Sequence, residues 1–215
     1  MAEAADPVSA IIRLVDLPAG VAGPEPVSFD VRCFVVPSGS GIALVDAALP
    51  GTVGEIERSI AGLGGSWSDV VDVIVTHGHF DHVAGLAELV GRCPTARLWA
   101  GVDDLAEVEN ASGRAVQAAV DLDRIGDLTV LETPGHTAGH ISLLHETASL
   151  LLIGDLVGVQ RGQLDFGPPA FTADPDRNRA SLARVVELDV DRILFSHGPE
   201  ISQPSDQIRT FLAAS

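Results

Sequence analysis

The sequence of 215 residues contains no lysine, no tyrosine and only two cysteines. Its 13 basic side chains are therefore all arginines, so no Schiff-base lysine, lysine phosphate clamp or tyrosine acid is available to a catalytic mechanism. Two cysteines are too few for a disulfide framework. Cys33 lies in an apolar run typical of a strand, and we expect it to be a small core residue and not a reactive thiol.

Positive charge is scarce relative to negative charge. Thirty acidic residues against 13 basic ones give a formal net charge of −17. A protein that binds the nucleic-acid backbone needs clusters of basic side chains, so this balance argues strongly against a nucleic-acid partner. Any positive charge beside a substrate has to come from arginine or from a metal ion.

Long apolar runs are missing as well. No segment reaches the roughly 18 uninterrupted apolar residues of a transmembrane helix. Residues 1–6 are acidic and lack the basic and apolar regions of a signal peptide. We expect a cytoplasmic protein without a membrane partner, folded as one domain over residues 1–215. Whether it forms a homo-oligomer stays open.

Alternating strand and helix patterns fill the chain. Apolar runs predict strands at 11–15, 31–36, 41–45, 70–75, 97–100, 128–131, 141–145, 150–153 and 192–195. Helical spacing predicts helices at 52–63, 83–90, 102–108, 174–188 and 205–213, with long loops at 17–26 and 157–175. Strands followed by helices in two comparable halves indicate an α/β fold, in which two sheets pack together with helices outside.

The segment Thr-His-Gly-His-Phe-Asp-His, residues 76–82, directly follows the predicted strand at 70–75. It holds three of the seven histidines of the chain. Imidazole and carboxylate groups are ligands for zinc and related divalent ions. Such a cluster at the end of a strand therefore predicts a metal site.

Three further candidate ligands follow predicted strands, each beside a glycine. His136 follows the strand at 128–131, Asp155 follows 150–153, and His197 follows 192–195. Glycine allows the sharp backbone turns that aim a side chain into a cleft. Loops at strand ends carry function because a rigid sheet positions them.

In order and spacing, these residues resemble the five motifs of the metallo-β-lactamase superfamily: Asp46; His77, His79, Asp81 and His82; His136; Asp155; and His197. The resemblance implies a four-layer αββα sandwich of two mixed sheets with helices outside. It implies that His77, His79 and His136 hold one ion, that Asp81, His82 and His197 hold a second, and that Asp155 bridges the two. Asp46 is expected to support a neighbouring group from behind, and Asp46 and Asp81 to serve catalysis. We expect His140 to make a structural hydrogen bond, and His145 to face solvent at a strand end.

The resemblance also implies a reaction. Two Zn²⁺ ions, with iron or manganese accepted by the same ligands, would hold a hydroxide that attacks a small ester, thioester or lactone. The ligand set is most similar to the glyoxalase II-like branch. The alternative is an oxidoreductase resembling the persulfide dioxygenases, which bind one iron through two histidines and an aspartate.

Three features of the sequence argue against the best-known substrates of this superfamily. Asp155 stands where the commonest β-lactamases have cysteine, which disfavours antibiotic hydrolysis. The chain has neither lysine nor tyrosine, and this argues against both glutathione thioesters and quorum-signal lactones as its substrates. A small-molecule substrate is expected, with the loops 17–26 and 157–175 as candidate walls of its cleft. The second loop contains Arg161, Phe166 and Phe171.

Overall fold

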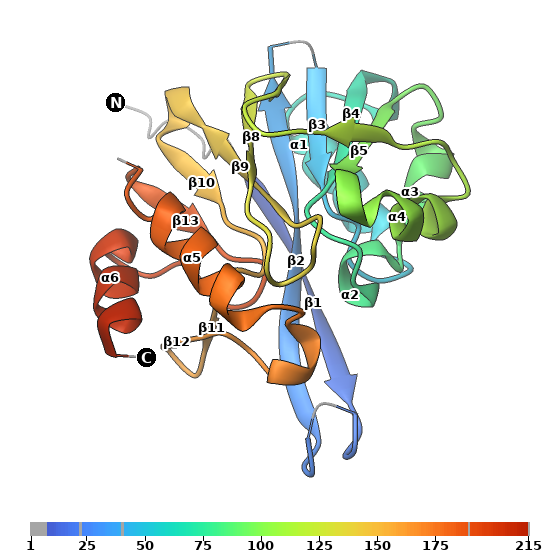
Figure 1. Cartoon of the computed structure of the whole chain (residues 1–215). Coiled ribbons are helices and arrows are strands. Elements are labelled where there is room, and N and C mark those ends of the chain that lie inside the picture. Colours follow the sequence, from blue (N-terminus) through green and yellow to red (C-terminus); the bar gives the residue numbers. More distant parts are fainter. Residues whose placement is uncertain (1–7, 22, 40, 189, 215) are drawn as a thin grey trace.

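Two β-sheets lie face to face at the centre of the computed structural model, and helices cover their outer faces (Figure 1). The structure describes residues 8–21, 23–39, 41–188 and 190–214. The layers follow the order helix, sheet, sheet, helix. The predicted α/β class and the αββα sandwich with two mixed sheets are therefore confirmed.

The first sheet has the strand order β1-β2-β3-β4-β5-β6. Its strands are β1 (Ser9–Leu17), β2 (Val27–Ser38), β3 (Gly41–Val45), β4 (Val70–Val75), β5 (Arg97–Gly101) and β6 (Gln117–Ala119). The pairs β1–β2 and β2–β3 are antiparallel, whereas β3, β4, β5 and β6 pair in parallel. Because parallel strands end at one edge of a sheet, the residues that follow β3, β4 and β5 meet at that edge.

The second sheet has the order β13-β10-β9-β8-β7. Its strands are β7 (Arg124–Ile125), β8 (Leu128–Glu132), β9 (Ile141–His145), β10 (Leu150–Leu152) and β13 (Arg192–Leu194). Only β10 and β13 pair in parallel within this sheet, as far as the described residues show. A separate hairpin is formed by β11 (Gly158–Gln160) and β12 (Gln163–Asp165).

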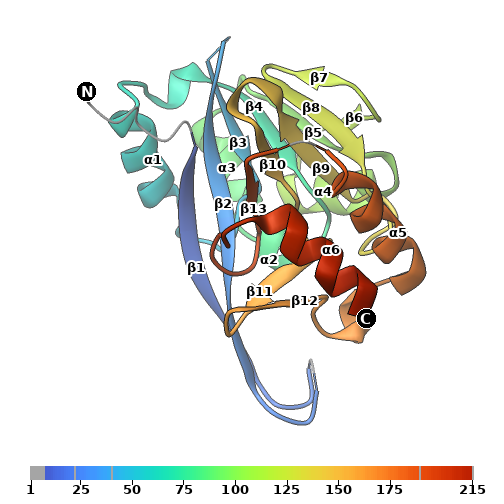
Figure 2. The same cartoon turned by 90° about the vertical axis from the view of Figure 1, so that its left-hand side faces the viewer.

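The outer helices belong to two groups. They are α1 (Val53–Gly62), α2 (Phe80–Val83), α3 (Leu86–Arg92) and α4 (Leu105–Ser112) beside the first sheet, and α5 (Pro175–Val185) and α6 (Pro204–Ala214) beside the second (Figures 1 and 2). Short 3₁₀ turns are η1 (Trp67–Asp69), η2 (Val102–Asp104), η3 (Glu146–Ala148) and η4 (Pro169–Phe171). No described helix has both the length and the apolar character needed to cross a membrane.

Alternation along the strands divides the core into layers. Val73 and Val75 of β4 pack towards the helices of the first sheet, whereas Ile74 packs between the sheets. In the second sheet, Leu152 of β10 faces the first sheet and Leu151 faces α5 and α6. Successive residues of a strand point to opposite faces of the sheet, so a strand that is covered on both faces is apolar along its whole length. Strand β4 comes close to this pattern.

Strands β1 and β2 form a hairpin longer than the sequence indicates. Their pairing continues from Ser9 opposite Val35 to Leu17 opposite Val27. The hairpin projects beyond the rest of the first sheet, at the lower end of the molecule in Figures 1 and 2. The expected loop at 17–26 is therefore confined to the tip, of which residue 22 lies outside the described residues.

Two further expectations at element ends need correction. The helix predicted at 83–90 is divided into α2 and α3, and α2 begins inside the histidine segment, at Phe80. His145 does not face solvent: it is 6% exposed. Strand β9 lies between β8 and β10, and both of its faces are covered. Side chains on either face of this strand, including that of His145, are therefore buried.

Candidate metal centre

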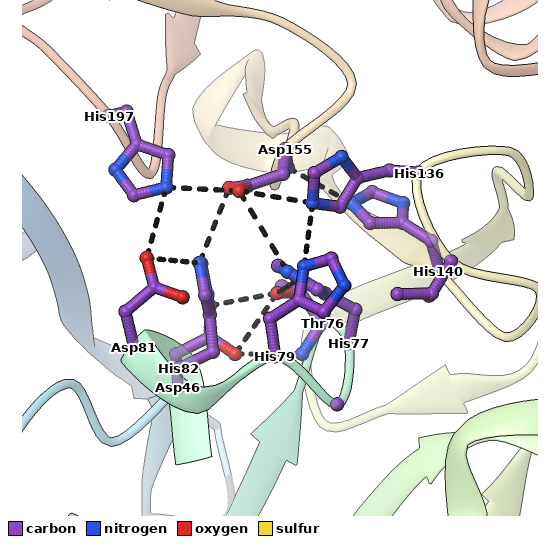
Figure 3. Close-up of polar contacts among 12 residues, drawn as sticks. Asp46, Thr76, His77, His79, Asp81, His82, His136, His140, Asp155 and His197 are labelled. Carbon is purple, nitrogen blue, oxygen red and sulfur yellow. Dashed lines mark hydrogen bonds and ion pairs between the residues drawn. The ribbon is translucent and has the colours of Figure 1, made fainter. Parts of the chain in front are cut away.

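The predicted ligands come together in one cluster (Figure 3). Each belongs to a segment that follows a strand, and Asp81 and His82 lie in the short helix α2 within such a segment. The segment 76–82 follows β4 of the first sheet. His136, Asp155 and His197 follow β8, β10 and β13 of the second sheet. The two sheets therefore contribute facing halves of a single cluster.

The seven side chains form overlapping groups of potential ligand atoms. Within each group the atoms lie within 4.8 Å of one another. The groups are His77, His79 and His136; Asp81, His82 and His197; and His77, His82 and Asp155. Asp155 thus lies with one histidine from each of the other two groups, which is the position required of a bridging carboxylate.

Short distances join the two halves of the cluster. Nε2 of His136 lies 2.9 Å from Nδ1 of His79. On the other side, Nε2 of His197 lies 2.9 Å from Oδ2 of Asp155 and 3.4 Å from Oδ2 of Asp81. The imidazole and carboxylate side chains point toward one another (Figure 3).

Hydrogen bonds behind the cluster orient three of the imidazoles. Nδ1 of His82 lies 2.9 Å from Oδ2 of Asp46, and Nδ1 of His197 lies 2.6 Å from the carbonyl oxygen of Asp30. Nδ1 of His77 lies 3.2 Å from the hydroxyl oxygen of Thr76. An Nδ1–H that donates outwards leaves the Nε2 lone pair free to face the centre, which is the form that binds metal.

Asp46 supports the cluster from behind, as predicted. Its carboxylate accepts hydrogen bonds from the backbone N–H of Thr76, at 2.8 Å, and from the Thr76 hydroxyl, besides that from His82. Its φ of +60° is in the left-handed region, which aspartate tolerates better than most residues. Asp46 directly follows β3, and its side chain reaches Thr76, the residue after the parallel neighbour β4.

Four buried atoms of the cluster lack a hydrogen-bond partner among the described residues. They are Nδ1 of His136, Nε2 of His77, Nε2 of His82 and Oδ1 of Asp155, and the last three belong to one group of potential ligand atoms. Each such atom costs about 1–3 kcal/mol when it is left unpaired. A divalent cation would satisfy the atoms of His77, His82 and Asp155, and nitrogen and carboxylate donors suit zinc, iron and manganese. The residues present therefore fit a divalent metal centre.

Burial and the neighbouring carboxylates shift the pKa values of the histidines in opposite directions. Burial lowers the pKa of His136 to about 3 and, together with the neighbouring His82, holds the pKa of His77 well below its usual value. Burial alone would also lower the pKa of His82, but the carboxylates of Asp155 and Asp46 outweigh it and raise that pKa. Neutral His77 and His136 have the lone pairs that a metal ligand needs.

His140 makes the structural hydrogen bond that was expected of it. Its Nε2 accepts from the backbone N–H of Asp155 at 3.0 Å, while its Nδ1 lies 2.8 Å from the hydroxyl of Thr133. A Cβ at Gly154 would lie 2.4 Å from Nε2 of His140, so only glycine leaves room for this contact. His140 thereby fixes the backbone that carries Asp155.

Asp104, a buried carboxylate at the end of η2, was not predicted from the sequence. Asp104 accepts from the backbone N–H groups of Gly78 and Gly139 and from the hydroxyl of Thr137, at 2.9, 3.0 and 2.6 Å respectively. It ties the loop of His77 and His79 to the loop of His136. No local pattern distinguishes it from its neighbour Asp103, which is exposed.

A cleft of ≈ 390 Å³ opens above the cluster. One wall comes from the β1–β2 hairpin and includes Leu17 and Val21; the other includes Phe166 and Phe171 from the loop after Asp155. Both loops considered as walls therefore line the cleft. Arg161 is exposed and is not among the lining residues.

Comparison with known families identifies the class of the protein. The model of the metallo-beta-lactamase superfamily matches residues 28–197, and the chain belongs to this family. YobT of Bacillus subtilis is 27% identical over 213 residues, which cover 86% of this chain and 90% of YobT. A hydroxyacylglutathione hydrolase of Rhodopseudomonas palustris is 40% identical over 98 residues, 45% of this chain and 37% of that relative. The chain thus matches little more than a third of the length of that hydrolase.

Solved structures share the fold. A metallo-beta-lactamase family protein from Thermus thermophilus superposes with a TM-score of 0.67 at 22% identity, covering 94% of this chain and 78% of that one. The protein TTHA1623, solved in a di-iron-bound form, gives a TM-score of 0.66 at 25% identity, over 82% of this chain and 91% of that one. AidC, a dizinc quorum-quenching lactonase, gives 0.65 at 16% identity, over 89% and 88%. Both the family and its fold were anticipated from the five motifs.

Proposed function

We propose that this protein is a dinuclear metallohydrolase that cleaves a small ester, thioester or lactone, with zinc as its metal. The observation that carries the proposal is the arrangement of Asp155. Its carboxylate reaches into both ligand groups, with Oδ2 at 3.8 Å from Nε2 of His77 and Oδ1 at 3.4 Å from Nε2 of His82. A single-ion site has no use for a second complete group of ligands on the far side of this carboxylate.

Each ion has its own ligands in this proposal. His77, His79 and His136 hold the first ion, while Asp81, His82 and His197 hold the second, and Asp155 bridges them. This set leaves open positions for water and substrate, as a catalytic site requires. Two bound divalent ions would supply a hydroxide at neutral pH and polarise the substrate carbonyl.

Hydrogen bonds from outside the cluster orient the imidazole ligands. Asp46 and the carbonyl of Asp30 hold the imidazoles of His82 and His197 with Nε2 facing the cluster. Asp81 is half-buried at the base of the cleft, where its carboxylate is open to the substrate side as well as to His197. These outward hydrogen bonds raise the basicity of the ligands and restrict their rotation.

Relatives support hydrolysis and leave the metal open. The hydroxyacylglutathione hydrolase and the dizinc lactonase are hydrolases by name, whereas TTHA1623 was solved with two irons. Persulfide dioxygenase-like chemistry at one iron remains the competing function. It needs only two histidines and one aspartate, and leaves the second ligand group without a purpose.

The test is elemental analysis of the purified protein together with a substrate panel. The panel contains thioesters, lactones, aryl esters and a cephalosporin. Two zinc ions per chain and hydrolysis of at least one ester, thioester or lactone are expected. One iron per chain with sulfide-dependent oxygen uptake would overturn the proposal. Asp155→Ala should lose both ions and hydrolysis by orders of magnitude, because the bridge serves both groups.

The same reasoning extends to partners and location. The acidic surface and the small cleft suit a small-molecule substrate and neither nucleic acid nor membrane. We propose a cytoplasmic location on the sequence evidence, and fractionation of the native organism's cells would test it.

A further inference from the structure

Apolar side chains form most of the walls of the cleft above the candidate metal centre. Leu17, Val21, Val27 and Phe29 line it from the β1–β2 hairpin. Leu17 and Val27 are paired at the end of the β1–β2 ladder. The hairpin projects past the rest of the first sheet (Figure 1). Val21 is 50% exposed and lines the cleft, so its side chain is accessible to a molecule that enters it.

The opposite wall is formed by Phe166, Pro168 and Phe171. The ring of Phe166 packs on Phe211 of α6, with centroids 4.7 Å apart. This contact fixes the wall to the body of the molecule. The cleft is therefore built by two segments that lie far apart in sequence, and its wall of aromatic rings is supported from behind.

The aromatic lining begins at the ligands themselves. Phe29 meets the imidazole of His197 edge to face, with centroids 5.1 Å apart, and Phe171 meets His79 at 6.4 Å. One phenylalanine thus flanks each ligand group. A substrate whose reacting carbonyl lies at the cluster places the adjoining carbon atoms between these two rings.

Charge in the cleft disfavours an anionic substrate group. Apart from the proposed metal ligands, the lining holds one acidic side chain, Asp165, and no arginine among the described residues. Arg32, on the same hairpin, is paired with Asp30 at 2.8 Å. A carboxylate placed between the apolar walls would lose its hydration and gain no cationic partner.

We propose that the cleft binds the apolar, uncharged acyl group of the substrate, and that it discriminates against acyl groups that carry a terminal carboxylate. This inference rests on the proposed hydrolase function, because it assigns the substrate of that site. The volume of ≈ 390 Å³ is within the range of small-molecule sites, which is about 300–1,000 Å³. The acyl group occupies the space between Phe29 and Phe171.

Chain length gives the first measurement. Each methylene group buried from water contributes about 0.8 kcal/mol, which corresponds to about fourfold in kcat/KM per added carbon. In a series of aryl esters from acetyl to decanoyl, kcat/KM should rise by about this factor until the cleft is full and then level off. A flat series, or a rise only with the length of the alcohol group, would overturn the assignment.

Charge gives the second measurement, through hexanoyl and adipoyl esters that differ by a terminal carboxylate. The hexanoyl ester should be preferred by at least tenfold. Val21→Asp should lower kcat/KM for the hexanoyl ester several-fold, while Val21→Arg should narrow the preference by raising turnover of the adipoyl ester. Val120→Asp and Val120→Arg are matched controls, because Val120 is 41% exposed and lies outside the cleft lining. If the Val21 and Val120 variants behave alike, the cleft does not select the acyl group.

A binding experiment distinguishes the failure of this inference from the failure of the hydrolase proposal. Neutral amides from butanamide to octanamide are titrated into the protein as purified, with calorimetric detection. Affinity should rise with length and fall in Val21→Asp, whether or not any ester is cleaved. Such binding without hydrolysis would contradict the proposed function alone. Ester hydrolysis with no dependence on acyl length or charge would contradict this inference alone.

Discussion

The carboxylate of Asp104 accepts a hydrogen bond from the backbone N–H of Gly139, at 3.0 Å, across the junction between the two sheets. The other oxygen of the same carboxylate accepts from the backbone N–H of Gly78. One side chain therefore sets the spacing between the histidine loop of the first sheet and the His136 loop of the second. The ligands that it positions belong to the group His77, His79 and His136.

Replacement of Asp104 should weaken metal binding as well as stability. Asp104→Ala leaves two backbone N–H groups without acceptors, which we expect to cost roughly 3 kcal/mol of unfolding free energy. We also expect about 10–100-fold weaker binding at the first ion, because loss of an outer hydrogen bond to a ligand shell has this effect. Denaturant unfolding and zinc titration against a chelating dye measure the two effects.

The neighbouring residue supplies the control for this prediction. Asp103 is exposed, and Asp103→Ala should change neither quantity. Destabilisation of Asp104→Ala with unaltered affinity for both ions would mean that Asp104 supports the fold and does not position the ligands.

Asp46 should act on the second ion in the same way. Its carboxylate accepts the Nδ1–H of His82, and both side chains are buried. Asp46→Asn keeps the size of the side chain but removes its charge, so the His82 imidazole is less firmly held and less basic. Zinc titration should show one site near the wild-type affinity and one weakened by about 10–100-fold. Weakening confined to the ion of the group His77, His79 and His136 would contradict the assignment of His82 to the second ion.

Two glycines provide a matched test of the packing beneath the site. A Cβ at Gly101 would lie 1.9 Å from the carbonyl oxygen of Gly139, whereas a Cβ at Gly91 in α3 would meet nothing within 4 Å. Gly101→Ala should therefore destabilise the protein by about 2 kcal/mol or more, since the strand and the loop have to separate. Gly91→Ala should stabilise it by about 0.5–1 kcal/mol through helix propensity. Thermal unfolding of both variants tests this, and similar shifts in Tm would disprove the close approach at Gly101.

The sequence predicts the layers of this fold because its apolar periodicity is strong where burial is complete. Strand β10 is apolar throughout, and β4, β8 and β9 are mostly apolar, so all four are recognisable as short apolar runs. Strands of two or three residues, such as β7 and β11, are too short to show a period and were missed. The burial of His145 was missed for a related reason, because period-2 alternation indicates exposure only where one face of the sheet is open.

The candidate site was predictable where its residues lie close together in sequence or beside strand ends. His77, His79, Asp81 and His82 share one short segment, and the structure brings His136, Asp155 and His197 to it. The contribution of Asp104 depends on its hydrogen bond with Gly139, which lies 35 positions away in the sequence. No local spacing pattern indicates a contact between residues so far apart. The length of the β1–β2 hairpin was also unpredictable, because half-exposed residues such as Leu17 and Val27 have no clear apolar pattern.

The two thiols should be inert in the folded protein. Cys33 and Cys93 are each 1% exposed, and burial raises the pKa of both, that of Cys93 to about 11. At pH 8 neither group forms the thiolate that reacts with disulfide reagents. Ellman's reagent should therefore titrate no thiol in the native protein and two after denaturation in guanidinium chloride. Because neither cysteine belongs to a ligand group, Cys93→Ala should retain the full metal content. Rapid modification of the native protein, or loss of metal in that variant, would instead place a reactive thiol at the site.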